Sequence, residues 1–172
     1  MRIIFPLSAL LLASACSTVV PAPPQEPAPA PAPTPAPPPA EPVQGDWTEW
    51  PLAQGDWTYR TESGGSIASF GPQNIQASFT IRCARDRKQL ILSRAGNVAD
   101  NGAQMTLTTT SAAQSYPARS NGNYTSITLS GADYMMDRIA FSRGRFAVET
   151  TGLASLAIPI WPEFTRVVED CR

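Results

Sequence analysis

The residue types that usually carry catalysis are scarce in this 172-residue chain. The sequence contains no His, the commonest general base and metal ligand, so neither a Ser-His-Asp nor a Cys-His arrangement can form. Its single Lys, Lys88, stands in a charged stretch that disfavours the desolvation a Ser-Lys pair needs. There is no GxxxxGK or GxGxxG phosphate-binding motif. We therefore expect a protein that is not an enzyme and that uses no cofactor or metal.

Aromatic and acidic side chains cluster where the sequence QGDWT occurs twice. The residues concerned are Trp47, Trp50, Trp57, Asp46, Glu49 and Asp56. The tryptophans could stack on a sugar whose hydroxyls bond to the carboxylates, and two of the carboxylates could serve a glycosidase. We favour packing, in which Trp57 begins the first strand while Trp47 and Trp50 cover a sheet edge. Carboxylates in such positions are mostly solvated.

Arginines form a second group with binding chemistry. Two of them, Arg143 and Arg145, lie in a turn that enters a strand, and three more, Arg82, Arg85 and Arg87, edge another strand. If the two turns converged, the guanidinium groups could hold a carboxylate or phosphate through bidentate hydrogen bonds. We favour a solvated rim that carries charges of both signs.

The N-terminus has the features of an export signal. Residues 1–15 combine a basic start, an apolar run too short to span a bilayer, and small residues before Cys16. The stretch Ala13-Ser14-Ala15-Cys16 resembles the lipobox of bacterial lipoproteins, which implies that Cys16 is acylated and becomes the new N-terminus. By the same resemblance, Ser17 favours the outer membrane. The alternative is a secretory signal that is cleaved without lipidation.

The other two cysteines are expected to pair. Cys83 lies on the apolar side of a predicted strand at 76–83, with Ala77, Phe79 and Ile81. Cys171 continues an apolar stripe of the predicted last helix, formed by Phe164, Val167 and Val168. Export places both thiols in an oxidising space. We predict a Cys83–Cys171 disulfide that attaches this helix to the sheet, in preference to a redox pair or a metal site.

Composition divides the chain into three parts. After the signal at 1–15, residues 16–42 form a tether in which Pro and Ala dominate, because such a segment lacks the apolar surface to fold. Proline favours an extended polyproline II conformation there. Residues 43–172 have the size of one domain. Their 12 acidic and 12 basic residues balance, so we expect no nucleic acid partner.

Short alternating segments separated by turn residues predict a mainly β domain. The expected strands are 56–61, 66–70, 76–83, 88–94, 104–110, 123–130, 145–150 and 153–158. The expected helices are 133–141, which Asp133 would cap, and one that begins near Pro162. We predict an antiparallel β-sandwich or partly open barrel with two short helices, the last of them pinned by the disulfide.

Three motifs resemble a family of uncharacterised small exported proteins and lipoproteins of Gram-negative bacteria. They are Gly55-Asp56-Trp57 with Tyr59 and Arg60, Phe79 with Arg82-Cys83, and the segment from Trp161 to Arg172. The likeness covers about residues 55–172 and implies no activity.

Together these features predict a lipid-anchored envelope protein on the periplasmic face of the outer membrane, with a non-catalytic binding or structural role. The alternative is a cell-wall glycan-binding module that uses Trp47, Trp50 and Trp57; a small hydrolase and an enzyme inhibitor are further alternatives. The partners considered are the membrane, reached through the lipid, and peptidoglycan or another envelope protein.

Overall fold

A computed structural model describes residues 45–99 and 101–172. The signal at 1–15, Cys16 and the tether at 16–42 lie outside the described residues. The strands in the described part are β1 (Asp56–Glu62), β2 (Gly65–Gly71), β3 (Phe79–Ala84), β4 (Gln89–Ala95), β5 (Gln104–Thr108), β6 (Ala113–Pro117), β7 (Arg119–Asn121), β8 (Tyr124–Ser130), β9 (Arg145–Thr150) and β10 (Leu156–Pro159). The helices there are α1 (Tyr134–Ala140) and α2 (Pro162–Asp170), with 3-10 turns η1 (Trp47–Glu49) and η2 (Arg85–Arg87).

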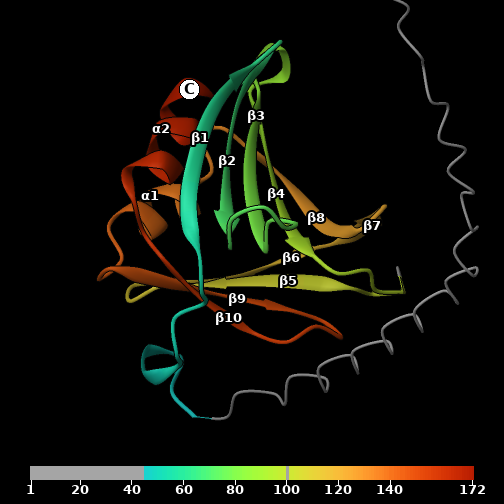
Figure 1. Cartoon of the computed structure of the whole chain (residues 1–172), viewed down its shortest axis with the longest axis vertical. Helices are drawn as coiled ribbons and strands as arrows, with labels where there is room; N and C mark the ends of the chain where they lie inside the picture. Colours follow the sequence, from blue (N-terminus) through green and yellow to red (C-terminus); the bar gives the residue numbers. More distant parts are fainter. Residues whose placement is uncertain (1–44, 100) are drawn as a thin grey trace, which may run out of the picture. The chain divides into compact units, whose positions relative to one another are not determined.

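These strands form two antiparallel sheets (Figure 1). The larger sheet has the order β1-β2-β3-β4-β8-β7, and the smaller has the order β10-β9-β5-β6. Along the described strands the chain passes between the two sheets after β4, after β6 and after β8. Just after β6, the Ala118 N–H donates to Ala103 O at 2.9 Å. Strands of the two sheets run in clearly different directions. The expected mainly β fold is therefore confirmed, as two open sheets rather than a closed barrel.

One hydrophobic core lies between the sheets and the helices. Its residues come from the alternating positions of the strands, as β3 illustrates: Phe79, Ile81 and Cys83 are buried, while Arg82 on the opposite face is exposed. The ring of Trp57 meets Phe79 edge-on within this core, with ring centroids 6.4 Å apart. Both sheets contribute buried side chains to the same cluster. The opposite face of the larger sheet is left free of the core.

The two helices lie on one side of the larger sheet (Figure 1). Asp133 caps α1 as expected, since its carboxylate accepts from the Met135 N–H at 2.9 Å. In α2, Pro162 occupies the first turn, and the expected stripe of Phe164, Val167 and Val168 is buried.

The predicted disulfide is confirmed: Cys83 and Cys171 are bonded, with Cα atoms 5.4 Å apart and 88 positions apart in sequence. It joins the end of α2 to the centre of the larger sheet.

Three expected strands had wrong limits, and two strands were not expected at all. The strand expected at 76–83 begins only at Phe79, because Gly71 and Asn74 have positive φ and the chain is still turning, so Ala77 is half-buried outside the sheet. The strand expected at 153–158 begins at Leu156, after the Leu153 N–H closes a turn onto Thr150 O. The strand expected at 104–110 ends at Thr108. The strands β6 and β7 were not expected, because they are short and half-exposed.

Candidate functional site

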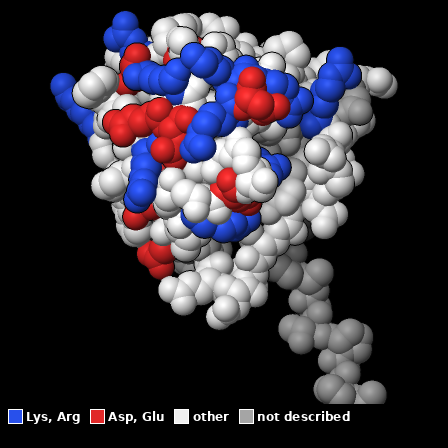
Figure 2. All heavy atoms as spheres, turned by 90° about the horizontal axis from the view of Figure 1, so that it is seen from above, with Lys and Arg blue, Asp and Glu red and all other residues white. Residues whose placement is uncertain are grey.

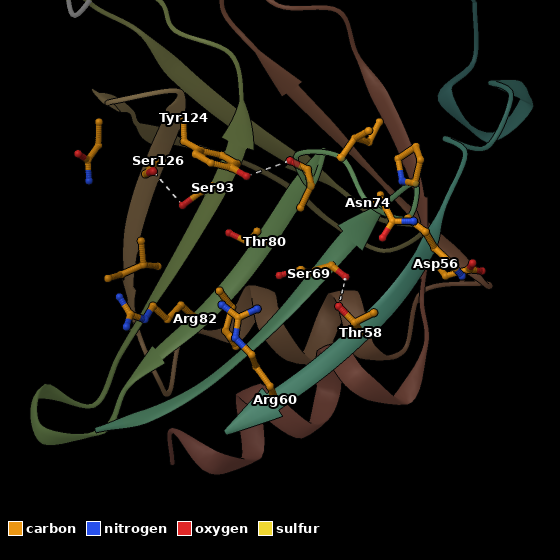
Figure 3. Close-up of a pocket in the computed structure, with 18 residues that line it drawn as sticks. Asp56, Thr58, Arg60, Ser69, Asn74, Thr80, Arg82, Ser93, Tyr124 and Ser126 are labelled. Carbon is orange, nitrogen blue, oxygen red and sulfur yellow. Dashed lines mark hydrogen bonds between the residues drawn. The ribbon is translucent and has the colours of Figure 1, made fainter. Parts of the chain in front are cut away.

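The outward face of the larger sheet is hollowed into a groove of about 630 Å³. Its walls come from β1, β2, β3, β4 and β8, and the loop at residues 72–77 closes one end. Figure 3 shows the lining side chains on the near face of the sheet, with the helices behind it. It is larger than two other hollows on the described residues, which have volumes of about 500 and 250 Å³.

A row of hydroxyl side chains crosses this groove. The register pairs Thr58 with Ser69, Ser69 with Thr80, Thr80 with Ser93, and Ser93 with Ser126. Five adjacent strands therefore place five hydroxyls side by side, over about 19 Å for four strand spacings of about 4.8 Å. All but the first residue of the row are half-buried although they point away from the core. The row is therefore a sheltered polar surface rather than an ordinary solvated face.

Only part of the hydrogen-bonding capacity in the row is used within the protein. The Ser126 hydroxyl donates to Ser93 Oγ at 2.9 Å, and Thr58 Oγ1 lies 3.4 Å from Ser69 O (Figure 3). No hydrogen bond within the described residues engages the Ser69 or Thr80 side-chain hydroxyl. These two groups, at the middle of the row, can donate to and accept from a ligand.

Two arginines line one end of the groove beside the hydroxyl row. Arg60 and Arg82 stand two residues along their strands from Thr58 and Thr80. Glu62 bridges them, with Oε1 2.9 Å from Arg60 Nη2 and Oε2 2.6 Å from Arg82 Nη2. Burial alone would raise the pKa of Glu62, but the hydrogen bond from Arg60 and the ion pair with Arg82 outweigh it and hold that pKa below its usual value. The carboxylate therefore stays charged at neutral pH, and the three groups carry a net charge of +1.

The other end of the groove is mixed, with polar side chains, Tyr124 and the exposed apolar Ile75. Asp56 lies at the start of β1, and Asn74 extends from the loop over the sheet (Figure 3). The Tyr124 hydroxyl donates to Ala77 O at 3.2 Å, and the Gln76 amide donates to Asn123 O at 3.3 Å. These bonds hold the loop against β8. The groove is thus bounded by a loop that the sheet itself supports.

The tryptophans do not form the platform considered from the sequence. Trp57 is only 5% exposed, and its Nε1 donates to Pro159 O at 2.8 Å. Trp50 is 7% exposed and packs with half-buried Trp47 against Ala147 and Ala157, on the outside of the smaller sheet. Rings buried in this way have no face free to stack on a sugar. The expectation of packing is therefore confirmed for Trp50 and Trp57.

The arginine turns have separate tasks. Arg145 Nη1 donates to Thr48 O at 3.1 Å and to Trp50 O at 2.9 Å, so this residue fastens the N-terminal segment to β9. Arg143 is exposed on the turn before β9. The guanidinium of Arg145 is therefore engaged by backbone carbonyls of the 48–50 segment, whereas Arg143 is solvated, as favoured from the sequence.

Charges of both signs are interspersed on the end of the molecule seen from above (Figure 2). The η2 turn, with Arg85, Asp86 and Arg87, belongs to this mixed surface. Arg82, by contrast, points to the groove side of β3. Arg82 was therefore considered from the sequence as a binding residue, but together with Arg85 and Arg87 rather than with the residues that line the groove.

The three carboxylates considered for catalysis lie at separate places in the structure. Asp46 caps η1, where it accepts from the N–H and hydroxyl of Thr48 at 2.8 and 2.7 Å, and these bonds lower its pKa. Asp56 lies in the groove, and Glu49 is exposed. An acid whose pKa is lowered is a poor proton donor at neutral pH. In residues 45–99 and 101–172, no three His, Cys, Asp or Glu side chains are grouped so as to hold a metal ion.

The hydroxyl row was not predicted from the sequence, although the outward strand positions carry an unusual residue type. Outward strand positions on a solvated face commonly carry Lys or Glu, whereas here the central ones are Ser or Thr in five segments. The row itself becomes visible only when the register of all five strands is known.

Comparison with protein-family models, with curated proteins and with solved structures finds no match to this chain. No helix in the part of the chain that the structure describes is long and apolar enough to cross a membrane.

Proposed function

We propose that this protein is a lipid-anchored, non-catalytic binding protein of the cell envelope, and that its ligand lies in the groove of the larger sheet. The observation that carries the binding role is the hydroxyl row. Polar side chains that are half-buried on an outward face, with hydroxyls left unpaired, are arranged for a partner rather than for water alone.

The location in the envelope is supported by different features. The lipobox-like sequence before Cys16 favours acylation and anchoring. The bond between Cys83 and Cys171 suits a protein that folds in an oxidising compartment. The outer membrane, on its periplasmic face, is the proposed site of the anchor.

The binding role is tested by photo-crosslinking in the bacterium that encodes the protein. A photoreactive amino acid replaces Thr58, an exposed residue of the row. In the control it replaces Ser115, an exposed serine of β6 on the smaller sheet. We expect a crosslinked envelope component at position 58 and none at position 115. Absence of a crosslink at 58, or equal crosslinking at both positions, would refute the groove as the binding site.

The anchor is tested separately by the intact mass of the protein extracted from membranes. Acylation at Cys16 should appear as a mass increase on a chain that begins at that residue, and Cys16→Ser should move the protein to the soluble periplasmic fraction. An unmodified mature chain in the membrane fraction would contradict the lipid anchor and leave the groove experiment unaffected.

A further inference from the structure

We propose that the groove binds an oligosaccharide that carries a carboxylate. This inference rests on the proposed binding function and adds the chemical class of the ligand. It uses the outward face of β1 to β4 and β8, not the buried tryptophans.

The hydroxyl row favours a sugar over a peptide or a lipid. Ser and Thr hydroxyls both donate and accept, as sugar hydroxyls do, so the two sets can pair in many orientations. An extended peptide adds to an unpaired strand edge. Such an edge is present at β1, on one wall of the groove, but β2, β3 and β4, which carry the centre of the hydroxyl row, are paired on both sides. A lipid chain requires a continuous apolar lining, whereas Ser69, Thr80 and Ser93 interrupt the apolar side chains of this groove.

Apolar side chains are present, but beside the row rather than within it. Ile67 and Ile91 are half-buried and occupy the same cross-strand row as Arg60 and Arg82. Along one edge of a bound ligand, the isoleucines can contact C–H groups of the ligand and the arginines can pair with its charged groups. The row length of about 19 Å is sufficient for several sugar rings.

The arginine pair indicates the carboxylate. The side chains of Arg60 and Arg82 are 63% and 51% exposed, so N–H groups remain free beyond those bonded to Glu62. Glu62 holds both guanidinium groups at the edge of the row and leaves one positive charge without a partner among these three residues. A ligand carboxylate placed there would accept charge-assisted hydrogen bonds and balance this charge.

The experiment measures binding of matched acidic and neutral saccharides by isothermal titration calorimetry to the full mature chain. The probes are tetramers of galacturonate and of mannuronate, and a peptide-free glycan of alternating N-acetylglucosamine and N-acetylmuramic acid. Each is paired with its counterpart in which the carboxyl groups are reduced to alcohols. We expect at least one acidic probe to bind about tenfold more tightly than its neutral counterpart.

Variants separate the two parts of the site. Arg82→Met should abolish the preference for the acidic probe and leave the affinity for the neutral probe unchanged within a factor of about two, whereas the matched control Arg143→Met should keep the preference. The double variant Ser69→Ala, Thr80→Val should lower the affinities for the acidic and the neutral probe by a similar factor. Circular dichroism and thermal unfolding verify that each variant is folded.

Each outcome has one meaning. Equal binding of acidic and neutral probes would overturn the carboxylate and retain a sugar site. No saccharide binding, together with a crosslink at Thr58 to a protein or a lipid in cells, would overturn the saccharide while the proposed binding function stands. No crosslink at Thr58 would remove the proposed function itself.

Discussion

The phenolic oxygen of Tyr59 donates a 2.7 Å hydrogen bond to Oδ2 of Asp170, the residue before the disulfide-bonded Cys171. The guanidinium of Arg166 lies over the same tyrosine ring, with Cζ 4.2 Å from its centroid. Edge strand β1 and the last helix are therefore connected by a polar contact close to the covalent one. Because β1 also forms one wall of the groove, this contact helps to position Thr58 and Arg60.

Replacing the tyrosine tests this connection. Tyr59→Phe removes one hydrogen bond to a charged group and keeps the ring under Arg166, so we expect a loss of about 1.5–3 kcal/mol in the free energy of unfolding. Urea unfolding followed by circular dichroism measures the loss. Tyr134→Phe, at an exposed tyrosine on α1, is the control and should change stability by less than about 0.5 kcal/mol. Equal losses in both variants would contradict the role of the contact.

The same carboxylate predicts a pH dependence. The nearby Ser66 side chain, the hydrogen bond from Tyr59 and the charges of Arg85 and Arg166 outweigh burial and lower the pKa of Asp170 from its ordinary value of 3.8. A group whose pKa is lower in the folded state stabilises the fold above its unfolded pKa, and this stability is lost as pH falls through the folded pKa. The free energy of unfolding should therefore decline below about pH 4 and be insensitive to this group at neutral pH.

The variant Asp170→Asn measures how much this residue contributes to the loss of stability at acid pH. The variant should be less stable than the parent at pH 7, and its stability should decline less steeply between pH 4 and the acid limit. Urea titrations at a series of pH values give both quantities. An unchanged acid slope in the variant would mean that other carboxylates, such as Glu62, carry the whole response.

The disulfide predicts a pattern of non-additivity. A closed loop of 88 positions corresponds to about 4–5 kcal/mol of stabilisation in the chain-entropy treatment. Cys83→Ser and Cys171→Ser should each lower the free energy of unfolding by a similar amount, and the double variant should cost little more than either. Unfolding curves of the three variants under oxidising conditions test this. Losses that add in the double variant would contradict the pairing.

Arg145 is predicted to hold the segment that carries Trp50. Arg145→Met removes charge-assisted bonds to two carbonyl groups, and we expect a loss of about 1.5–3 kcal/mol together with greater exposure of that tryptophan. The red shift of tryptophan emission and its quenching by acrylamide report the exposure. Arg143→Met is the matched control, since its side chain is exposed two residues earlier, and it should leave both signals unchanged.

The sequence predicted those parts of the fold that depend on one segment at a time. Alternation in β3 and the apolar stripe of α2 each place a cysteine on a buried side, and together with the export signal this predicted their bond. Pro162 and Asp133 marked the beginnings of helices through local preferences of their own. Trp50 was predicted to pack because its neighbours suggested no continuous strand.

Features that depend on several segments could not be obtained in this way. The hydroxyl row needs the register of five strands, and a shift of one residue in any of them would turn its hydroxyl toward the core. Arg145 was considered for an anion site and placed by preference on a solvated rim, because nothing local shows that two carbonyl groups of the 48–50 segment lie within its reach. The limits of β3 depended on positive φ at Asn74, a conformation that the sequence does not require.

The position of the Cys83–Cys171 bond determines how the domain responds to tension. If the chain is anchored at Cys16, mechanical load enters the domain through residues 45–53 and reaches β1 and β2 before it reaches Cys83. Everything from Cys83 to Cys171 is enclosed by a bond that unfolding does not break, so only the part before it can lengthen under load. The contacts of residues 48–53 with β9 and β10 would have to break first. After that, β1 and β2 could leave the sheet and open the groove, while residues 83–171 stay closed in one loop.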